Sequence, residues 1–422
     1  MPHTIFASHD PLHAKIVRRE SSYFAKDLAD NLRNLTDEIK GSKCLFIGAG
    51  GSIGSNTLKT VLAFEPAAIY VIDHNENGLA ELVRDLRSQS DIKMPPEFVT
   101  LPFDYGGPIF QKWFLSQSRS FDFILNFAAL KHVRSEKDPY SVLAMLETNV
   151  MKLARLQSLL NDDPKTRRLF SVSTDKAANP SSMMGATKRL MEHALFLPST
   201  NQAGSFITSS ARFANVALSN GSLLQSWEYR LKAQQPFACP KDCRRYFVSL
   251  PESGHLCTLA AFSATRNQIF LPDMAPEDHL ILLEEVVQDF LAIHGLEATF
   301  LDTEAEAKAR LPELVARNKY PVLLTPLNTS GEKPYEEFVA EREVLKTVGM
   351  THLKAVDYLP PQKPETFWLL LEALQSRLFF QADDVAPTDT LDINALRQLI
   401  ATVEPAFLQT HRQSRERLDE RM

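Results

Sequence analysis

A glycine-rich segment near residue 50 has the residue types and spacing to hold a phosphate group. It directly follows the apolar run 44–47, and a helical pattern begins immediately after it. Glycine lets the backbone turn tightly and approach a pyrophosphate, while the N–H groups that begin the following helix face the negative charge. This context predicts a dinucleotide-binding loop, with a ligand-free glycine-rich turn as the alternative. The candidate phosphate-binding residues are Gly48, Gly50, Gly51, Ser52, Ile53 and Gly54.

Acidic and small residues at the ends of the next predicted strands extend this cofactor site. The carboxylate of Asp73 can accept hydrogen bonds from the adenosine ribose, which favours NAD. NADP stays possible because Arg84 is not far away in the sequence. Asp104 either meets the adenine or caps a turn. Ala128 and Ala129 are small enough to let a cofactor lie against the backbone.

A second group of chemically capable residues follows the fifth predicted strand. Thr174, Asp175 and Lys176 place a hydroxyl, a carboxyl and an amine in consecutive positions. Neighbouring residues on a strand point to opposite faces, so these groups can act together only if the strand has ended by Thr174. Met184 and Lys188 share one face of the next predicted helix, which would put the ammonium beside the nicotinamide ribose. The alternative is that Met184 fills the core and Lys188 is a surface charge.

These motifs resemble those of the extended short-chain dehydrogenase/reductases. More narrowly, they resemble the UDP-N-acetylglucosamine 4,6-dehydratases of the capsular polysaccharide synthesis family. The most specific element is the run Ser-Thr-Asp-Lys-Ala followed by Met-Gly-Ala-Thr-Lys. Most short-chain dehydrogenases have tyrosine four residues before the lysine, and Met184 at that position is similar to a Met-containing branch of these dehydratases. The other matching segments are 48–55, 73–74, 131–133, 148–150, 212–222 and 331–333.

The resemblance implies dehydration of a UDP-N-acetylhexosamine, most simply UDP-N-acetylglucosamine, to a UDP-4-keto-6-deoxy sugar. Hydride leaves sugar C4, water is eliminated across C5 and C6, and hydride returns to C6. The resemblance assigns Lys176 as the base at C5 and Asp175 as the acid at the C6 oxygen, with Asn149 in the cofactor site. A dry site narrows the free-energy gap between the ion pair and the neutral amine and acid that this assignment needs. Thr174 or an ordered water handles the C4 hydroxyl proton.

A further set of residues is expected to bind the sugar nucleotide. Asn215 supplies an amide, Ser222 can cap a helix that faces the diphosphate, and Arg245 supplies positive charge. Lys131 reaches the sugar if the resemblance holds, or else is a surface lysine. Glu332 belongs to a Gly-Glu-Lys segment that closes over the nucleotide in the family. Thr and Ser precede it here in place of the usual Arg-Pro, which removes one bidentate phosphate donor.

The elements that must position these residues alternate between short apolar runs and helical patterns. This rhythm predicts a doubly wound parallel sheet of the Rossmann type with helices on both faces, and a smaller mixed substrate-binding domain after it. The predicted strands are 44–47, 68–72, 98–103, 121–127, 169–172 and 206–208, with a later one at 322–324. The predicted helices are 53–64, 76–89, 109–118, 139–161, 183–196, 280–294, 364–380 and 391–410.

Four regions follow from this reading of the chain. They are an N-terminal helical arm at 1–40, an NAD-binding Rossmann domain at 41–216, a sugar-nucleotide-binding region at 217–360 and a helical C-terminal extension at 361–422. The pattern leaves the role of residues 266–320 open. The amphipathic arm and tail favour a homo-oligomer.

Composition excludes several other classes of protein. The 422 residues carry a net charge of −6, which disfavours binding to nucleic acid. We expect a cytoplasmic protein, because no apolar stretch is long enough for a membrane span and only four cysteines occur. No metal is expected, because Cys239 and Cys243 lack further ligands at suitable spacing. The alternatives to a dehydratase are a sugar-nucleotide 4-epimerase or dehydrogenase, and a catalytically silent NAD-binding regulator.

Overall fold

The largest unit of the fold is built on a mostly parallel sheet. The computed structural model describes residues 8–117, 120–131, 136, 138–160, 165–201, 206–213, 215–327, 335–378 and 392–411. In spatial order, the strands of this sheet are β15 Leu345–Thr347, β16 Leu353–Asp357, β11 Gln268–Pro272, β6 Ile207–Ala211, β5 Arg168–Val172, β4 Phe123–Asn126, β1 Lys43–Ile47, β2 Ala68–Ile72 and β3 Glu97–Leu101. The strands from β11 to β3 run parallel, and β16 and β15 add an antiparallel edge.

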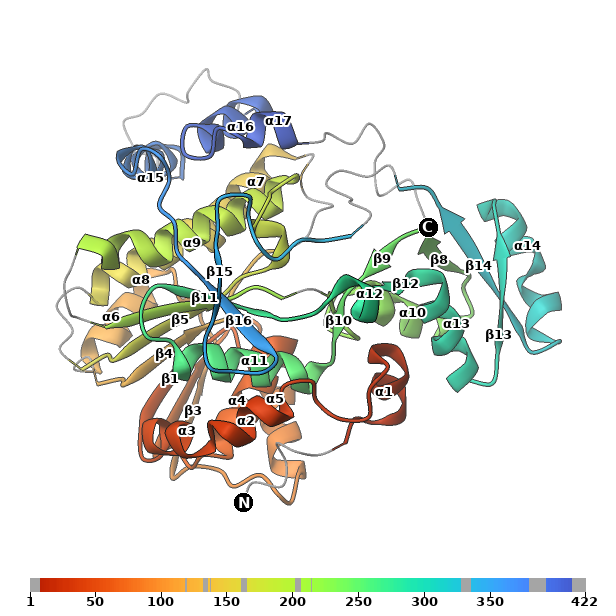
Figure 1. The fold of residues 1–422 in the computed structure, drawn as a ribbon, viewed down its shortest axis with the longest axis horizontal. Coiled ribbons are helices and arrows are strands. Elements are labelled where there is room, and N and C mark those ends of the chain that lie inside the picture. The colour runs from red at the N-terminus through yellow and green to blue at the C-terminus, as the bar shows by residue number, and fades with distance from the viewer. Residues whose placement is uncertain are drawn as a thin grey trace.

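Helices cover both faces of this sheet, as the continuous apolar runs of its central strands require. In Figure 1, α7, α8 and α9 lie on one face, and α4 and α11 lie on the other. The helices that connect or cover its strands are α4 Ser52–Leu62, α5 Glu76–Ser88, α6 Pro108–Ser116, α7 Pro139–Leu146, α8 Lys152–Leu160, α9 Met183–Asn201 and α11 Leu250–Ser263. The predicted doubly wound α/β fold is confirmed.

Two differences from the predicted elements concern the helix after β4 and the extent of the large sheet. The predicted helix 139–161 is interrupted by a π-helical turn, Glu147–Met151, between α7 and α8. The sheet also takes in strands β11, β15 and β16, which lie beyond the proposed boundary at residue 216. β11 pairs in parallel with β6 after the crossover through α11, so this strand continues the same winding pattern.

A smaller unit lies beside the large sheet and has an apolar core of its own (Figure 1). Its three-stranded parallel sheet has the order β13 Glu297–Leu301, β14 Lys319–Thr325 and β8 Phe237–Pro240. Its helices are α10 Leu223–Lys232, α12 Pro276–His279, α13 Leu283–Ile293 and α14 Glu304–Val315. Two further short pairings are β7 Asn215–Val216 with β10 Phe247–Val248, and β9 Arg244–Arg245 with β12 Ile281–Leu282.

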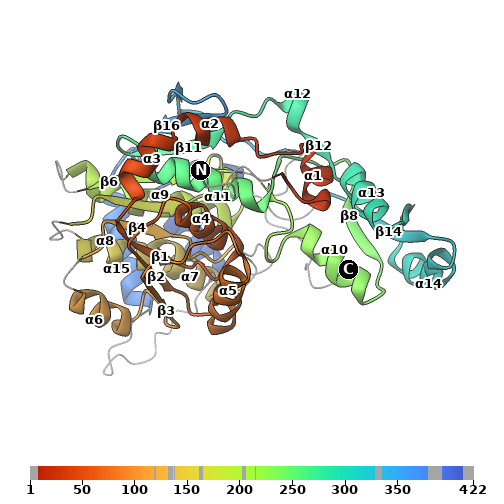
Figure 2. The same cartoon turned by 90° about the horizontal axis from the view of Figure 1, so that it is seen from below.

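The N-terminal arm crosses both units. It comprises α1 Pro11–Val17, α2 Ala25–Asp30 and α3 Leu32–Ile39 (Figure 2). Ile16 packs in the core of the smaller unit, whereas Phe24 packs in the core of the large one. Glu252 of α11 anchors the arm, because its carboxylate accepts hydrogen bonds from Arg19 Nε and the Tyr23 amide, each at 2.8 Å. The apolar residues of the arm are therefore covered by the chain itself.

The C-terminal extension packs over the face formed by α7 and α9 (Figure 1). It consists of α15 Glu365–Leu378, α16 Ile393–Ala401 and α17 Phe407–Thr410, so the predicted helix 391–410 is two helices. Glu404 binds His193 at 2.7 Å and Arg189 at 3.2 Å, and both of these residues lie on α9. The Thr410 hydroxyl donates to the Pro180 carbonyl at 2.7 Å. Within the described ranges, no helix combines the length and apolar character that a membrane crossing needs.

Candidate active site

The glycine loop lies where the strand order of the large sheet reverses. β1 is flanked by β2 and β4, and ligands of such sheets bind beyond the strand ends at this switch point. Gly48 directly follows β1 with φ of +80°, and a Cβ atom there would lie 2.5 Å from the Ala128 nitrogen. Only glycine lets the loops after β1 and β4 approach this closely. Ala129 follows Ala128 on the same strand-end loop.

The N-terminus of α4 is arranged to receive an anion. Gly51 is the N-cap, and among the described residues no side chain caps the helix. Its first N–H groups are therefore left for a ligand, which is the arrangement that a pyrophosphate needs. The Ser52 hydroxyl accepts a hydrogen bond from the Asn220 amide at 2.9 Å, which joins this loop to the predicted sugar-nucleotide segment. Ile53 and Gly54 complete the first turn of α4.

Asp73 lies directly beside this loop at the end of β2. It is only 9% exposed, and its carboxylate accepts hydrogen bonds from the Gly50 amide at 3.0 Å and the Asn75 amide at 2.9 Å. Arg84 is exposed and pairs with Glu81 on its own helix, α5. An anionic side chain therefore stands where the adenosine ribose of a dinucleotide would bind, and the loop and Asp73 together fit such a ligand.

Asp104 and Asn149 have well-defined partners in the protein. Asp104 accepts a hydrogen bond from the Gly106 amide at 2.9 Å and pairs with Lys152. Burial raises the pKa of its carboxyl, but these partners outweigh burial and hold the pKa below its usual value. These contacts match the turn-capping alternative for Asp104. Asn149, in the π-helical turn, donates to the Leu130 carbonyl and accepts from the Leu130 amide, both at 2.9 Å, and so holds the loop after β4.

The segment after β5 brings a hydroxyl, a carboxyl and an amine together. β5 ends at Val172, Thr174 is extended, and residues 175–177 form a 3₁₀ turn, so the predicted end of the strand before Asp175 is confirmed. Asp175 Oδ1 accepts from the Thr174 hydroxyl at 2.7 Å. The Asp175 side chain is fully buried, and its Oδ2 atom has no hydrogen-bond partner among the described residues. A buried carboxyl with one free oxygen is suited to proton transfer.

Lys176 lies between two carboxylates. Its Nζ is 3.3 Å from Asp175 Oδ1 and 3.4 Å from Glu336 Oε1. Burial opposes the charge of Lys176, but the two carboxylates outweigh burial and raise the pKa of the ammonium above its usual value. The ammonium is therefore the resting form of Lys176. Glu336 is not among the site residues predicted from the sequence. It lies close to Glu332 in the chain, but no sequence motif indicates that it contacts Lys176.

Helix α9 brings a second lysine to the same strand end. Lys188 Nζ donates to the Val172 carbonyl at 2.7 Å, and the residue is only 4% exposed. The alternative of a surface charge is therefore wrong. Burial lowers the pKa of Lys188 to about 8, although Glu192 opposes this shift. Met184 is also buried, and its amide donates to Glu136 Oε1 at 2.9 Å.

Gly185 lets the first turn of α9 approach the candidate catalytic turn, which consists of residues 174–177. A Cβ atom on Gly185 would lie 2.6 Å from the Lys176 carbonyl oxygen, so Gly185→Ala must push the two segments apart. A displacement of about 1 Å in a reacting group costs about 100-fold in rate. We expect Gly185→Ala to lower kcat/KM of the reaction proposed below about 100-fold. The control is Gly107→Ala, whose Cβ atom would lie 3.4 Å from the Asp104 carbonyl oxygen, and its kcat/KM should stay near wild type. Equal rates in the two variants would contradict this role.

The predicted sugar-nucleotide residues have different surroundings in the structure. The Asn215 side-chain amide donates to the carbonyl of Tyr246, the residue that follows Arg245, at 3.4 Å. Ser222 caps α10 by accepting from the Gln225 amide at 3.2 Å, so its predicted capping role is confirmed. Lys131 is exposed on the loop after β4. Glu332, with Thr329 and Ser330, lies outside the described residues.

A buried cluster of charges lies behind the catalytic turn. The Ser173 hydroxyl donates to Glu192 at 2.7 Å, and Arg212 bridges Glu192 and Glu343 at 2.6 and 2.5 Å. Arg189 pairs with Glu343 at 2.8 Å and extends the cluster to the C-terminal extension through Glu404. The cluster therefore ties β5, β6, α9 and the C-terminal part of the chain to one another beside the catalytic turn.

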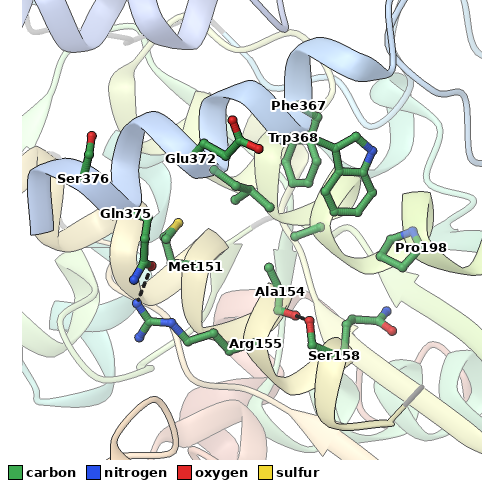
Figure 3. Close-up of a pocket in the computed structure, with 13 residues that line it drawn as sticks. Met151, Ala154, Arg155, Ser158, Pro198, Phe367, Trp368, Glu372, Gln375 and Ser376 are labelled. Carbon is green, nitrogen blue, oxygen red and sulfur yellow. Dashed lines mark hydrogen bonds between the residues drawn. The ribbon is translucent and has the colours of Figure 1, made fainter. Parts of the chain in front are cut away.

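A cavity of about 750 Å³ lies elsewhere, between α8, α9 and α15 (Figure 3). Its wall combines apolar side chains such as Phe367 and Trp368 with Arg155, which donates to Gln375 at 3.3 Å. It is lined by none of the predicted site residues. The candidate active site is instead the set of strand ends described above.

Curated relatives cover much of this chain at low identity. A Methanocaldococcus jannaschii protein described as an uncharacterized membrane protein is 29% identical over 74% of this chain and 84% of its own length. The capsular polysaccharide biosynthesis protein CapD of Staphylococcus aureus is 28% identical over 74% of this chain, and the match spans only 47% of that protein. A Campylobacter jejuni UDP-N-acetylglucosamine 4,6-dehydratase (inverting) is 29% identical over 56% of this chain and 67% of its own length.

The comparison with solved structures agrees with the fold. Pen from Bacillus thuringiensis matches with a TM-score of 0.61 at 19% identity, over 80% of this chain and 98% of that one. At this identity the likeness establishes the fold alone. The family model described as polysaccharide biosynthesis protein matches residues 44–357, which include the glycine loop, the catalytic turn and the sugar-nucleotide segment. The chain therefore belongs to the polysaccharide biosynthesis protein family.

Proposed function

We propose that this protein is an NAD-dependent dehydratase that converts a UDP-N-acetylhexosamine, most simply UDP-N-acetylglucosamine, to a UDP-4-keto-6-deoxy sugar. The observation that carries the proposal is the catalytic turn. Asp175 has a buried, unpartnered oxygen among the described residues, and Lys176 lies next to it at the same strand end. Met184 occupies the position of the usual tyrosine, so proton transfer must come from another pair. The Campylobacter relative, which is named as a UDP-N-acetylglucosamine 4,6-dehydratase, supports this choice.

The glycine loop and Asp73 would hold the cofactor. A nicotinamide dinucleotide bound there would supply the hydride acceptor for sugar C4 and the hydride donor for C6. The uncapped N-terminus of α4 would neutralise the pyrophosphate, and Asp73 would accept the ribose hydroxyls. Lys188 of α9 has a lowered pKa, its Nζ atom reaches the end of β5, and it is proposed to bind the nicotinamide ribose.

The catalytic turn can return every proton that it uses. Lys176 first loses its ammonium proton to solvent, which leaves a neutral amine beside the Asp175 carboxylate. The C4 hydroxyl proton then passes to the Thr174 hydroxyl, which is already hydrogen-bonded to Asp175, and from there to the Asp175 carboxylate. The neutral amine of Lys176 takes the C5 proton, while Asp175 gives its proton to the leaving C6 oxygen, which departs as water. Lys176 then returns its proton to C5, and both side chains are restored. Closure over the substrate dries the site and favours the neutral amine, because desolvation opposes charge.

The test is a nuclear magnetic resonance time course of purified protein with UDP-N-acetylglucosamine and NAD in heavy water. The expected result is loss of water, a 4-keto-6-deoxy product and deuterium at C5. A product that keeps its C6 hydroxyl would indicate an epimerase or dehydrogenase instead. No turnover of UDP-N-acetylglucosamine or UDP-N-acetylgalactosamine, together with retained NAD binding, would indicate a silent NAD-binding regulator.

Asp73→Asn tests the cofactor site. Asn75 and Gly50 donate to the Asp73 carboxylate, and a neutral amide loses the charge that strengthens bonds to ribose hydroxyls. Hydrogen bonds to charged groups contribute about 1.5–3 kcal/mol, so we expect NADH to bind about 10- to 100-fold more weakly, measured by the fluorescence of bound NADH. Asp85→Asn is the control, because Asp85 is an exposed residue of α5 that pairs with Lys59 of α4. Unchanged affinity in Asp73→Asn would place the ribose elsewhere.

A further inference from the structure

Glu336 reaches the catalytic lysine from a distant part of the chain. It is only 4% exposed, and its Oε1 atom lies 3.4 Å from Lys176 Nζ. The Asp175 Oδ1 atom lies at almost the same distance, 3.3 Å, from the same Nζ. Asp175 already accepts from the Thr174 hydroxyl and from the Lys176 amide through that Oδ1 atom. Among the described residues, Glu336 therefore has fewer hydrogen-bond partners than Asp175 has.

We propose that Glu336 is a positioning residue that holds the Lys176 ammonium in place and sets the pH at which Lys176 becomes a base. The inference rests on the proposed function only in giving Lys176 that role. The effect on the amine itself does not require any reaction, because the ion pair is present in the protein alone.

The sign of the effect follows from the charges that face Lys176. Asp175 and Glu336 favour the ammonium, whereas burial and Arg245 on β9 oppose it, and the carboxylates prevail. Removing the charge of Glu336 therefore lowers the pKa of Lys176. An opposite charge within about 4–6 Å moves a pKa by about 1–3 pH units, so the change is measurable. Because a base acts in its neutral form, the acidic limb of the rate profile must follow in the same direction.

The first experiment needs no substrate. Lys176 is 28% exposed, so a small acylating reagent can reach it, and its modification can be followed against pH by peptide mass spectrometry. In Glu336→Gln we expect the midpoint pH for modification of Lys176 to fall by about 1–3 pH units. In Glu336→Asp, which keeps the charge, we expect this midpoint to lie between those of Glu336→Gln and the wild type. Glu337→Gln is the matched control, because Glu337 is bound by Asn179 at 2.9 Å and is exposed. An unchanged midpoint in a folded Glu336→Gln protein would overturn the proposal.

The second experiment measures kcat/KM for dehydration against pH. We expect the acidic limb to move to lower pH in Glu336→Gln and to stay in place in Glu337→Gln. If the wild type is inactive while the labelling midpoint shifts, the proposed function fails and the assignment of Glu336 stands. If the wild type is active and neither the midpoint nor the limb moves, the assignment fails alone. If Glu336→Gln does not fold, Glu336→Asp is used instead. A midpoint pH for modification of Lys176 in Glu336→Asp as low as that of free lysine would contradict the proposal.

Discussion

Replacing Lys176 with alanine is expected to lower dehydration by about 100- to 10,000-fold, the range in which a positioned general base contributes. The reason is that Lys176 is the amine at the catalytic turn, 3.3 Å from Asp175, and Met184 offers no proton in its place. The measurement is release of the 4-keto product from UDP-N-acetylglucosamine under saturating NAD. NADH affinity should stay near wild type, because Lys176 is not part of the glycine loop.

Asp175→Asn removes two proton transfers at once. Asp175 is proposed both to accept the C4 hydroxyl proton through Thr174 and to protonate the leaving C6 oxygen. We therefore expect release of the 4-keto product to fall by about 100- to 10,000-fold, without accumulation of reduced nicotinamide, whose absorbance is measured in parallel. The matched control for Lys176→Ala is Lys308→Ala, because Lys308 pairs with Glu304 on the exposed surface of α14. Wild-type turnover in Lys176→Ala would contradict the proposed chemistry.

The strand ends of the candidate site could be predicted from sequence because their signals are local. The apolar run that ends at Ile47 and the glycine at residue 48 together specify a strand followed by a tight loop. The position of Asp73 follows from the same repeat of strand and helix. The end of β5 before Asp175 and the common face of Met184 and Lys188 also depend only on short-range geometry.

The groups that tune this chemistry could not be predicted, because they come from far along the chain. Glu336 meets Lys176 only after the chain has crossed the smaller unit and returned. The π-helical turn that contains Asn149 lies within an uninterrupted helical pattern, where periodicity gives no warning of it. The charged contacts of Arg212 and Glu343 likewise join segments that share no sequence motif. Tertiary packing alone decides such pairings.

Arg212→Met is expected to cost about 3–5 kcal/mol of unfolding free energy, as removal of one partner from a buried ion pair does. Arg212 is fully buried and bridges Glu192 and Glu343, so its loss leaves two carboxylates short of a partner in the core. Arg189 compensates only in part, because it also serves Glu404. The measurement is urea unfolding at neutral pH, with Arg310→Ala as the control, since its pair with Glu306 on α14 is exposed and contributes little.

The pH dependence of this loss distinguishes an unpaired charge from a simple packing defect. Burial raises the pKa of Glu343, but Arg212 outweighs burial and lowers it from 4.5 to about 2. A carboxyl with a depressed folded-state pKa contributes stability above its unfolded pKa, and that stability is lost as pH falls through the folded value. The destabilisation caused by Arg212→Met should therefore shrink between about pH 4.5 and pH 2, because protonation of Glu343 removes the unpaired charge in the variant and the ion pair in the wild type. A loss that stays constant across this range would mean that Arg212 stabilises the fold by packing, not by charge.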